Sequence, residues 1–162
     1  MTDTTLPGIG ALHEDEDGLV TPPLSVGILD AEVEFTFPEW DPEDADPAEV
    51  TAVTQTITAF RDAPQSVLAV ASEAIYAYYR ETADALVDEP DLEDWFPEIG
   101  SPEEVWDHVT LGENPTVEEE DGIWYVSLES ECEWDEEGGL QIVFRSGGEI
   151  TKVGPFDGLL TD

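Results

Sequence analysis

The sequence predicts an α+β domain: an N-terminal β-hairpin, a helical pair and a short helix, followed by a C-terminal antiparallel β-meander. Three observations lead to this class. Apolar residues alternate with polar ones before residue 40, recur at helical spacing between residues 47 and 86, and alternate again after residue 115. At 162 residues and 40% hydrophobic content, the chain can bury one core. We expect residues 1–22 to be an extended, poorly ordered lead-in and residues 23–162 to form a single domain.

The first element is a β-hairpin in the segment LSVGILDAEVEFTFPEW. An apolar run from Val26 to Leu29 precedes a turn at Asp30-Ala31. Successive residues of a strand point to opposite faces, so the alternation that follows buries one set of side chains: Val33, Phe35 and Phe37.

Two helices are predicted next. The first begins at Asp46, an N-cap residue followed by Pro47 at the first helical position and by an acid at Glu49. Pro64 ends this helix, and its short joint to the second predicts a helical hairpin. The inner stripe of the second helix comprises Val67, Ala71, Ile75, Tyr79 and Leu86.

A loop carrying Trp95 and Phe96 follows, and we expect these rings to pin it to the core. The third helix is short. Ser101 as N-cap, Pro102 and Glu104 form the pattern of a capping box, which predicts a helix in the segment SPEEVWDHVTLG.

The last third predicts a four-stranded meander. One pair of strands joins at Asp121-Gly122 and the next at Ser146-Gly147-Gly148. Along residues 123–134 the core-facing parity comprises Trp124, Val126, Leu128, Ser130, Cys132 and Trp134. The glutamates between them point outward, so the apparent cluster of cysteine, tryptophan and acids in ECEWDEEGG is divided between the two faces of the sheet.

The formal net charge of −37 comes from 41 acidic residues against four basic ones. The acids spread from Asp3 to Asp162 rather than forming one block, which argues against an acidic tail. We interpret them as an adaptation to concentrated salt, where charge repulsion is screened. A second hypothesis is an acidic DNA mimic that inhibits a nucleic-acid-binding protein. Direct binding to nucleic acid or to an anionic membrane is disfavoured.

Candidate catalytic and metal-binding patterns are weak. Cys132 lies on the apolar parity between two glutamates, and both features disfavour a thiolate. His108 follows Glu104 at i,i+4 spacing, which predicts a structural contact, and nothing links His13 to a nucleophile. The acidic segment HEDEDGLVTPPL fails the calcium-loop pattern at both ends. We therefore predict no catalytic residue, no metal site and no cofactor. An unrecognised hydrolase stays open, because 41 acids offer chance pairs.

The remaining candidates are loop aromatics. Trp40, Trp95 and Phe96 are the predicted interface residues. The chain shows no secretion signal and no apolar stretch long enough to span a bilayer, and a single cysteine permits no internal disulfide. The sequence thus favours a non-enzymatic, soluble, cytoplasmic domain that binds a protein partner, with an immunity-like or inhibitor role as one version. No pattern indicates an oligomeric state.

Residues 105–161 also carry a resemblance. A Trp-x-x-Val helix at Trp106, a Cys-x-Trp strand end at Cys132, a Gly-Leu-Gln-Ile-Val-Phe strand from Gly139 and a Val-Gly-Pro-aromatic-Asp-Gly terminus from Val153 occur in this order. This C-terminal third resembles the uncharacterised bacterial family catalogued as domain of unknown function 6985. Members commonly have Glu-His-Gly where this chain has Glu137-Gly138-Gly139. The resemblance implies an α+β domain and no transferable activity.

Overall fold

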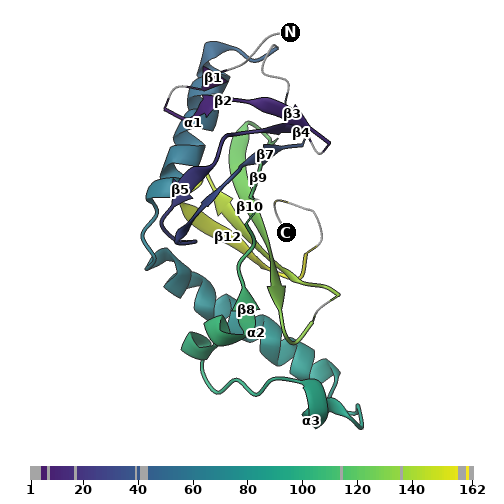
Figure 1. Ribbon diagram of the computed structural model, residues 1–162. Coiled ribbons are helices and arrows are strands. Elements are labelled where there is room, and N and C mark those ends of the chain that lie inside the picture. Colours follow the sequence, from purple (N-terminus) through teal and green to yellow (C-terminus); the bar gives the residue numbers. More distant parts are fainter. Residues whose placement is uncertain are drawn as a thin grey trace.

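The computed structural model describes residues 5–6, 8–16, 18–38, 40, 44–113, 115–135, 137–156 and 160, and it confirms the α+β class (Figure 1). The N-terminal third contains short strands: β1 (Thr5–Leu6), β2 (Gly10–Ala11), β3 (His13–Asp15), β4 (Gly18–Val20), β5 (Leu24–Val26), β6 (Ala31–Val33) and β7 (Thr36–Phe37). The middle holds α1 (Pro47–Asp62), α2 (Val67–Ala85), α3 (Leu92–Trp95) and the 3-10 helix η1 (Pro102–His108). The last strands are β8 (Val109–Thr110), β9 (Thr116–Glu120), β10 (Ile123–Cys132), β11 (Leu140–Arg145) and β12 (Glu149–Gly154).

The predicted meander is confirmed. Strands β9 to β12 pair antiparallel in sequence order, and the main sheet continues from β9 through β7 and β4 to β3. Asp121 (φ 54°) and Gly122 (φ 82°) both adopt left-handed backbone conformations in the β9–β10 turn, as a two-residue hairpin turn requires. The core-facing parity of β10 is buried from Trp124 to Trp134, while Glu129, Glu131 and Glu133 are exposed.

The N-terminal hairpin is confirmed with a shifted turn. Strands β5 and β6 pair antiparallel around residues 27–30. The chain then leaves this hairpin, because the backbone of Phe35 pairs with Thr21 through both its N–H and its carbonyl group. Strand β7 consequently joins the main sheet between β4 and β9, parallel to β9.

The predicted lead-in contains more structure than we expected. Residues 5–20 form four short strands, and their apolar side chains enter the main core: Leu6, Ile9, Leu12 and Val20 are buried. These strands occupy the top of the molecule in Figure 1.

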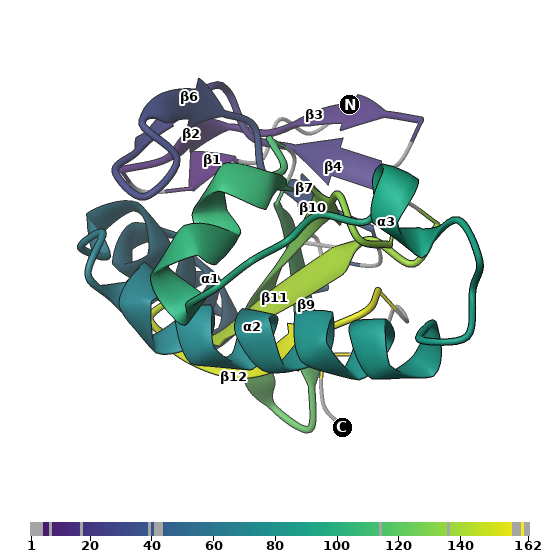
Figure 2. The same ribbon diagram turned by 90° about the horizontal axis from the view of Figure 1, so that it is seen from below.

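The predicted helical hairpin is wrong, although both helices form as expected. Asp46 caps α1 by accepting from the Glu49 N–H at 2.8 Å. Helices α1 and α2 then follow one another along one side of the sheet instead of folding back (Figures 1 and 2). Helix α1 contacts β5 and β10, whereas α2 contacts β12 and η1. Each apolar stripe is therefore buried against the sheet and not against the other helix.

The core lies between this helical side and the sheet. On the opposite side of β10 and β11 a smaller cluster forms from Tyr125, Val143 and Leu160. Among the described residues, no helix is long and apolar enough to cross a membrane.

Candidate functional site

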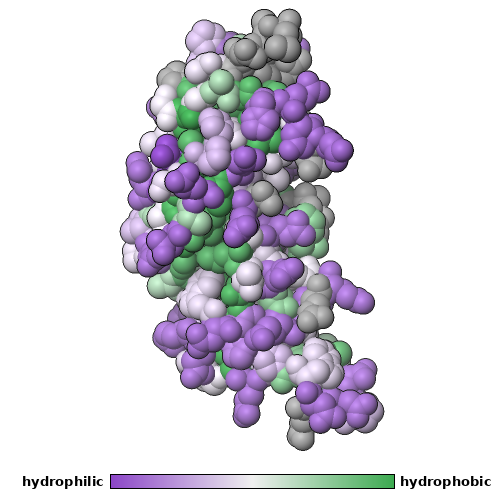
Figure 3. Space-filling view, viewed as in Figure 1, coloured by the Kyte–Doolittle hydropathy of each residue, from purple (hydrophilic) through white to green (hydrophobic). Residues whose placement is uncertain are grey.

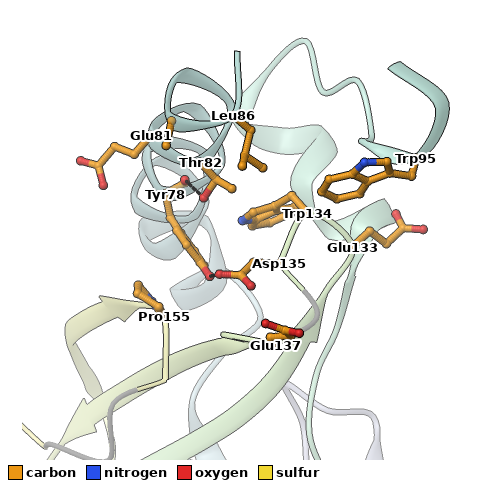
Figure 4. A pocket seen from close by; sticks show the side chains of 11 residues that line it. Tyr78, Glu81, Thr82, Leu86, Trp95, Glu133, Trp134, Asp135, Glu137 and Pro155 are labelled. Carbon is orange, nitrogen blue, oxygen red and sulfur yellow. Dashed lines mark hydrogen bonds between the residues drawn. The ribbon is translucent and has the colours of Figure 1, made fainter. Parts of the chain in front are cut away.

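A groove of about 770 Å³ lies beside the C-terminal half of α2 (Figure 4). We call it the α2 groove. Helix α2 and the residue after it line one wall with Tyr78, Glu81, Thr82, Ala85 and Leu86. The connection from β10 to β11 lines the other with Glu133, Trp134, Asp135 and Glu137. Trp95 of α3 and Pro155 after β12 complete the lining.

Aromatic side chains run from the floor of the α2 groove to its rim. Trp134 is 1% exposed and packs edge-to-face with Tyr78 at 5.7 Å and with Tyr79 at 5.6 Å between ring centroids. Tyr79 stacks on Phe96, and Phe96 contacts Trp95. Trp95, the last ring of this series, is 53% exposed and lies at the solvent edge.

The Trp134 indole nitrogen is a buried donor that has no acceptor among the described residues. Figure 4 shows the nitrogen end of the ring directed toward Tyr78 and Thr82, on the α2 side of the groove. A buried N–H without an acceptor costs free energy. The α2 groove thus contains an unmet hydrogen-bond donor.

Tyr78 joins the helix to the sheet through its hydroxyl group. The phenol lies 2.9 Å from both Asp135 Oδ2 and the Gly139 carbonyl oxygen, two acceptors for its one proton. Burial raises the pKa of this phenol well above its ordinary value, and the hydrogen bond to Asp135 raises it further. Tyr78 is therefore a protonated structural donor and not a general base.

The Asp135 carboxylate shapes the turn between β10 and β11. Its Oδ1 accepts from the Gly138 N–H at 2.8 Å, and the Asp135 carbonyl accepts from the Gly139 N–H at 2.9 Å. A Cβ atom at position 138 would lie 2.4 Å from Asp135 Oδ2. The absence of a side chain at Gly138 lets the carboxylate fold over the turn and reach Tyr78.

Cys132 lies beneath this turn, and the prediction that it faces the core is confirmed. It is 3% exposed, and its Sγ lies 3.5 Å from the carbonyl oxygens of Asp135 and Gly139. Burial raises the pKa of the thiol to about 11. The thiol is thus protonated at neutral pH, which is the opposite of what a cysteine nucleophile requires.

The predicted contact between His108 and Glu104 is wrong. His108 Nδ1 pairs instead with the Glu133 carboxylate, and Glu104 accepts from the Gly100 N–H at 2.9 Å. The reason is the 3-10 geometry of η1, which has three residues per turn and therefore separates i,i+4 neighbours. His13 is exposed on β3. No group of three or more His, Cys, Asp or Glu suited to a metal occurs in the described part of the chain.

The three predicted interface residues have different surroundings. Trp40 is partly buried against Phe37 and Trp124, at 5.0 and 5.7 Å between ring centroids. Phe96 pins its loop to α2 by stacking on Tyr79, as predicted for that loop. Trp95 alone of the three lines the α2 groove. Sequence reasoning missed Tyr78, Thr82 and Asp135, whose roles depend on how the helix meets the turn.

The fold and the groove define a small α+β domain with an aromatic, carboxylate-rimmed surface groove. The chain belongs to the family described as Domain of unknown function (DUF6985), whose model matches residues 8–160. This match confirms the resemblance and extends it from the C-terminal third to nearly the whole chain. Residues Glu136, Asp157 and Gly158 of the shared pattern lie outside the described residues. No curated protein and no solved structure matches the chain.

Proposed function

We propose that this protein is a non-enzymatic binding domain that engages a protein partner through the α2 groove, and that its acidic surface adapts it to a salt-rich cytoplasm. One observation carries the binding role. Of the four large hydrophobic side chains exposed in the described part of the chain, Trp95 at 53% exposure lines the groove, and Val87 at 70% and Phe156 at 42% each follow a lining residue in the sequence.

These three residues come from different segments of the chain. Val87 follows Leu86, and Phe156 follows Pro155, both of which line the groove. The Phe156 N–H donates to the Gly138 carbonyl at 2.9 Å, which ties it to the β10–β11 turn. Apolar patches with a polar rim mark interaction sites on soluble proteins. On a surface covered with carboxylates, these exposed apolar side chains favour a docking role for this end of the molecule.

The arrangement of acids supports adaptation to salt. Exposed carboxylates occur on β3, the β5–β6 hairpin, both long helices and the C-terminal meander, and hydrophilic residues cover much of the face in Figure 3. No Asp or Glu is among the buried residues that the structure describes. A DNA mimic needs its acids in one elongated row, and this distribution favours a general solvent effect instead.

The hydrolase alternative gains little from the groove. Glu81, Glu133 and Glu137 are exposed, and Asp135 is engaged in the turn and with Tyr78. A general acid is usually tuned by burial in an apolar site. An immunity-like or inhibitor role fits the binding proposal, since both act by docking on another protein.

The test compares two single substitutions in a pull-down from a lysate of the source organism in about 2 M KCl. Trp95→Ala removes an exposed ring from the groove, whereas Val70→Ala trims an exposed apolar residue elsewhere on α2. We expect a partner that the wild type and Val70→Ala retain and Trp95→Ala loses. A set of bound proteins identical for all three chains contradicts the docking role.

A further inference from the structure

We infer that the α2 groove receives an arginine side chain from the partner, a specificity that rests on the proposed docking function. The first reason is charge. Four carboxylates line the groove among the described residues, Glu81, Glu133, Asp135 and Glu137, and no Lys or Arg is among the described residues that line it. Two of the four already have partners, since Glu133 pairs with His108 and Asp135 accepts from Tyr78 and Gly138. Arg80, the nearest cation along α2, lies over the Tyr76 ring at 5.9 Å. Figure 4 shows the Glu81 and Glu133 carboxylates at the outer edges of the groove, so an incoming group of positive charge meets acids at the rim.

The second reason is the aromatic lining. Trp95, 53% exposed, offers a π surface at the rim of the groove, while Trp134 and Tyr78 are buried behind it. A cation over such a ring is attracted by the ring quadrupole, and tryptophan is the strongest partner. Guanidinium is planar and weakly hydrated, stacks on rings and offers five donors in a fork, whereas ammonium is a compact, strongly hydrated charge. An exposed tryptophan ring with carboxylates around it at the rim therefore suits arginine better than lysine.

Concentrated salt is a third reason to expect that the groove recognises arginine through direct contact. At about 1 M salt the Debye length is about 3 Å, so long-range attraction between an acidic surface and a basic partner is lost. Recognition must then come from groups in direct contact. Ring stacking and short hydrogen bonds act at contact distance, which makes an aromatic groove a salt-tolerant device for binding a cation.

The fourth reason is the Trp134 indole N–H, which needs a hydrogen-bond acceptor that a peptide can supply. Its indole N–H has no acceptor among the described residues. An arginine that arrives on a peptide segment brings main-chain carbonyl oxygens, and because this nitrogen is buried, such an oxygen reaches it only when the side chains that cover it move aside. The volume of about 770 Å³ has room for a side chain with its flanking backbone.

The probe is a capped Gly-Gly-Arg-Gly-Gly peptide, titrated into the full chain in about 2 M KCl, with the indole N–H signals of Trp95 and Trp134 followed by NMR. Matched peptides carry lysine or neutral citrulline in place of arginine. We expect saturable shifts at both indoles with arginine, binding weaker by about five-fold or more with lysine, and none with citrulline.

Two pairs of variants locate the site. Trp95→Ala and Glu81→Gln should each weaken arginine binding by about three-fold or more, whereas Val70→Ala and Glu73→Gln, exposed on α2 outside the groove, should leave it unchanged. Equal shifts with all three peptides, or arginine binding that survives Trp95→Ala, would overturn the arginine assignment. If a Trp95-dependent partner is captured while the arginine peptide fails, the docking function stands and the assignment alone is wrong.

Discussion

The two long helices meet the same sheet in different ways. Helix α1 does so through Phe60, a fully buried ring 5.6 Å from Phe35 and 4.9 Å from Phe144 between centroids. Helix α2 meets the turn between β10 and β11 through Tyr78, whose hydroxyl lies 2.9 Å from Asp135 and Gly139 oxygens. The neighbouring Tyr79 hydroxyl donates at 2.8 Å to the Pro97 carbonyl oxygen in the segment after α3.

This difference explains why the groove lies beside α2. A phenyl ring is stabilising only where other atoms touch it. The contact of α1 with the sheet is therefore fully packed around Phe60, and we call it the closed contact. A tyrosine hydroxyl extends the contact by a hydrogen bond to a carbonyl oxygen, and the backbone on the other side stays further away. The α2 groove lies at this hydrogen-bonded contact, where Tyr78 meets the turn between β10 and β11.

The largest expected effect comes from the closed contact. Phe60→Ala should lower the free energy of unfolding by about 3–5 kcal/mol, because it leaves a cavity between Phe35 and Phe144. Denaturant unfolding in molar KCl measures it. Val70→Ala, at a position 66% exposed, serves as the control and should change stability by less than about 0.5 kcal/mol. A loss below about 1 kcal/mol for Phe60→Ala would show that the α1 contact is not closed.

A pair of glycines tests how tightly the β11–β12 turn fits α1. Gly147 (φ 83°) and Gly122 (φ 82°) have the same backbone conformation. A Cβ at Gly147 would lie 2.0 Å from the Thr56 carbonyl oxygen, whereas at Gly122 it meets nothing within 4 Å. Both alanine variants carry the left-handed cost of about 1–2 kcal/mol, and Gly147→Ala should lose about 1–3 kcal/mol more. Equal losses in chemical unfolding would rule out the close contact with α1.

The buried thiol beneath the groove predicts a pH dependence. The folded pKa of Cys132 is raised from 9.0 to about 11, so between these values the unfolded chain releases the thiol proton and the folded chain keeps it. The free energy of unfolding therefore falls as pH rises from about 9 to 11, by roughly 2 kcal/mol. Stability curves of wild type and Cys132→Ala should converge by that amount across this window. Parallel curves would mean that the thiol is not shielded.

The hydrogen-bonded contact should be weaker than the closed one. Tyr78→Phe keeps the ring and removes the donor to Gly139 and Asp135, and we expect a loss of about 1 kcal/mol. Tyr76→Phe is the matched control, because that hydroxyl makes a longer bond of 3.3 Å to the Ile99 carbonyl. Thermal or chemical unfolding of both variants checks the order. A larger loss for Tyr76→Phe would contradict the part assigned to Tyr78.

The smallest effect concerns the exposed ion pair at the groove rim. Glu133→Gln removes the partner of His108, and both side chains are at least partly exposed. The loss should be about 0.5 kcal/mol at low salt. It should vanish in molar KCl because the pair is screened. An effect that persists in molar KCl would indicate a less solvated pair than the structure shows.

Local signals explain which parts of the fold were predictable. The meander follows from alternation and from Asp121-Gly122, which adopts the turn conformation that this dipeptide favours. The start of α1 follows from Asp46 and Pro47. The docking of residues 5–20 and the parallel pairing of Thr36 with Thr116 depend on contacts far apart in the chain. No local pattern encodes them.

The groove was only partly predictable for the same reason. Trp95 was a candidate because a loop tryptophan is conspicuous in sequence. Tyr78 was not, since the helical stripe assigns Tyr79 to the inner face. Both rings pack on Trp134, and Tyr79 also stacks on Phe96. Asp135 looked like one acid among many. Its distinct role appears only when the turn brings it to the α2 phenol.

The free energy of unfolding as a function of KCl concentration tests whether the carboxylate surface is a response to solvent. Circular dichroism with urea unfolding, from about 0.15 to 3 M KCl, should show little structure at the low end and a steady gain of stability toward molar salt. A variant with ten exposed acids outside the groove changed to amides should fold at low salt and lose most of this dependence. A wild-type chain that is fully folded at about 0.15 M KCl, with stability that does not rise with salt, would contradict the proposed adaptation.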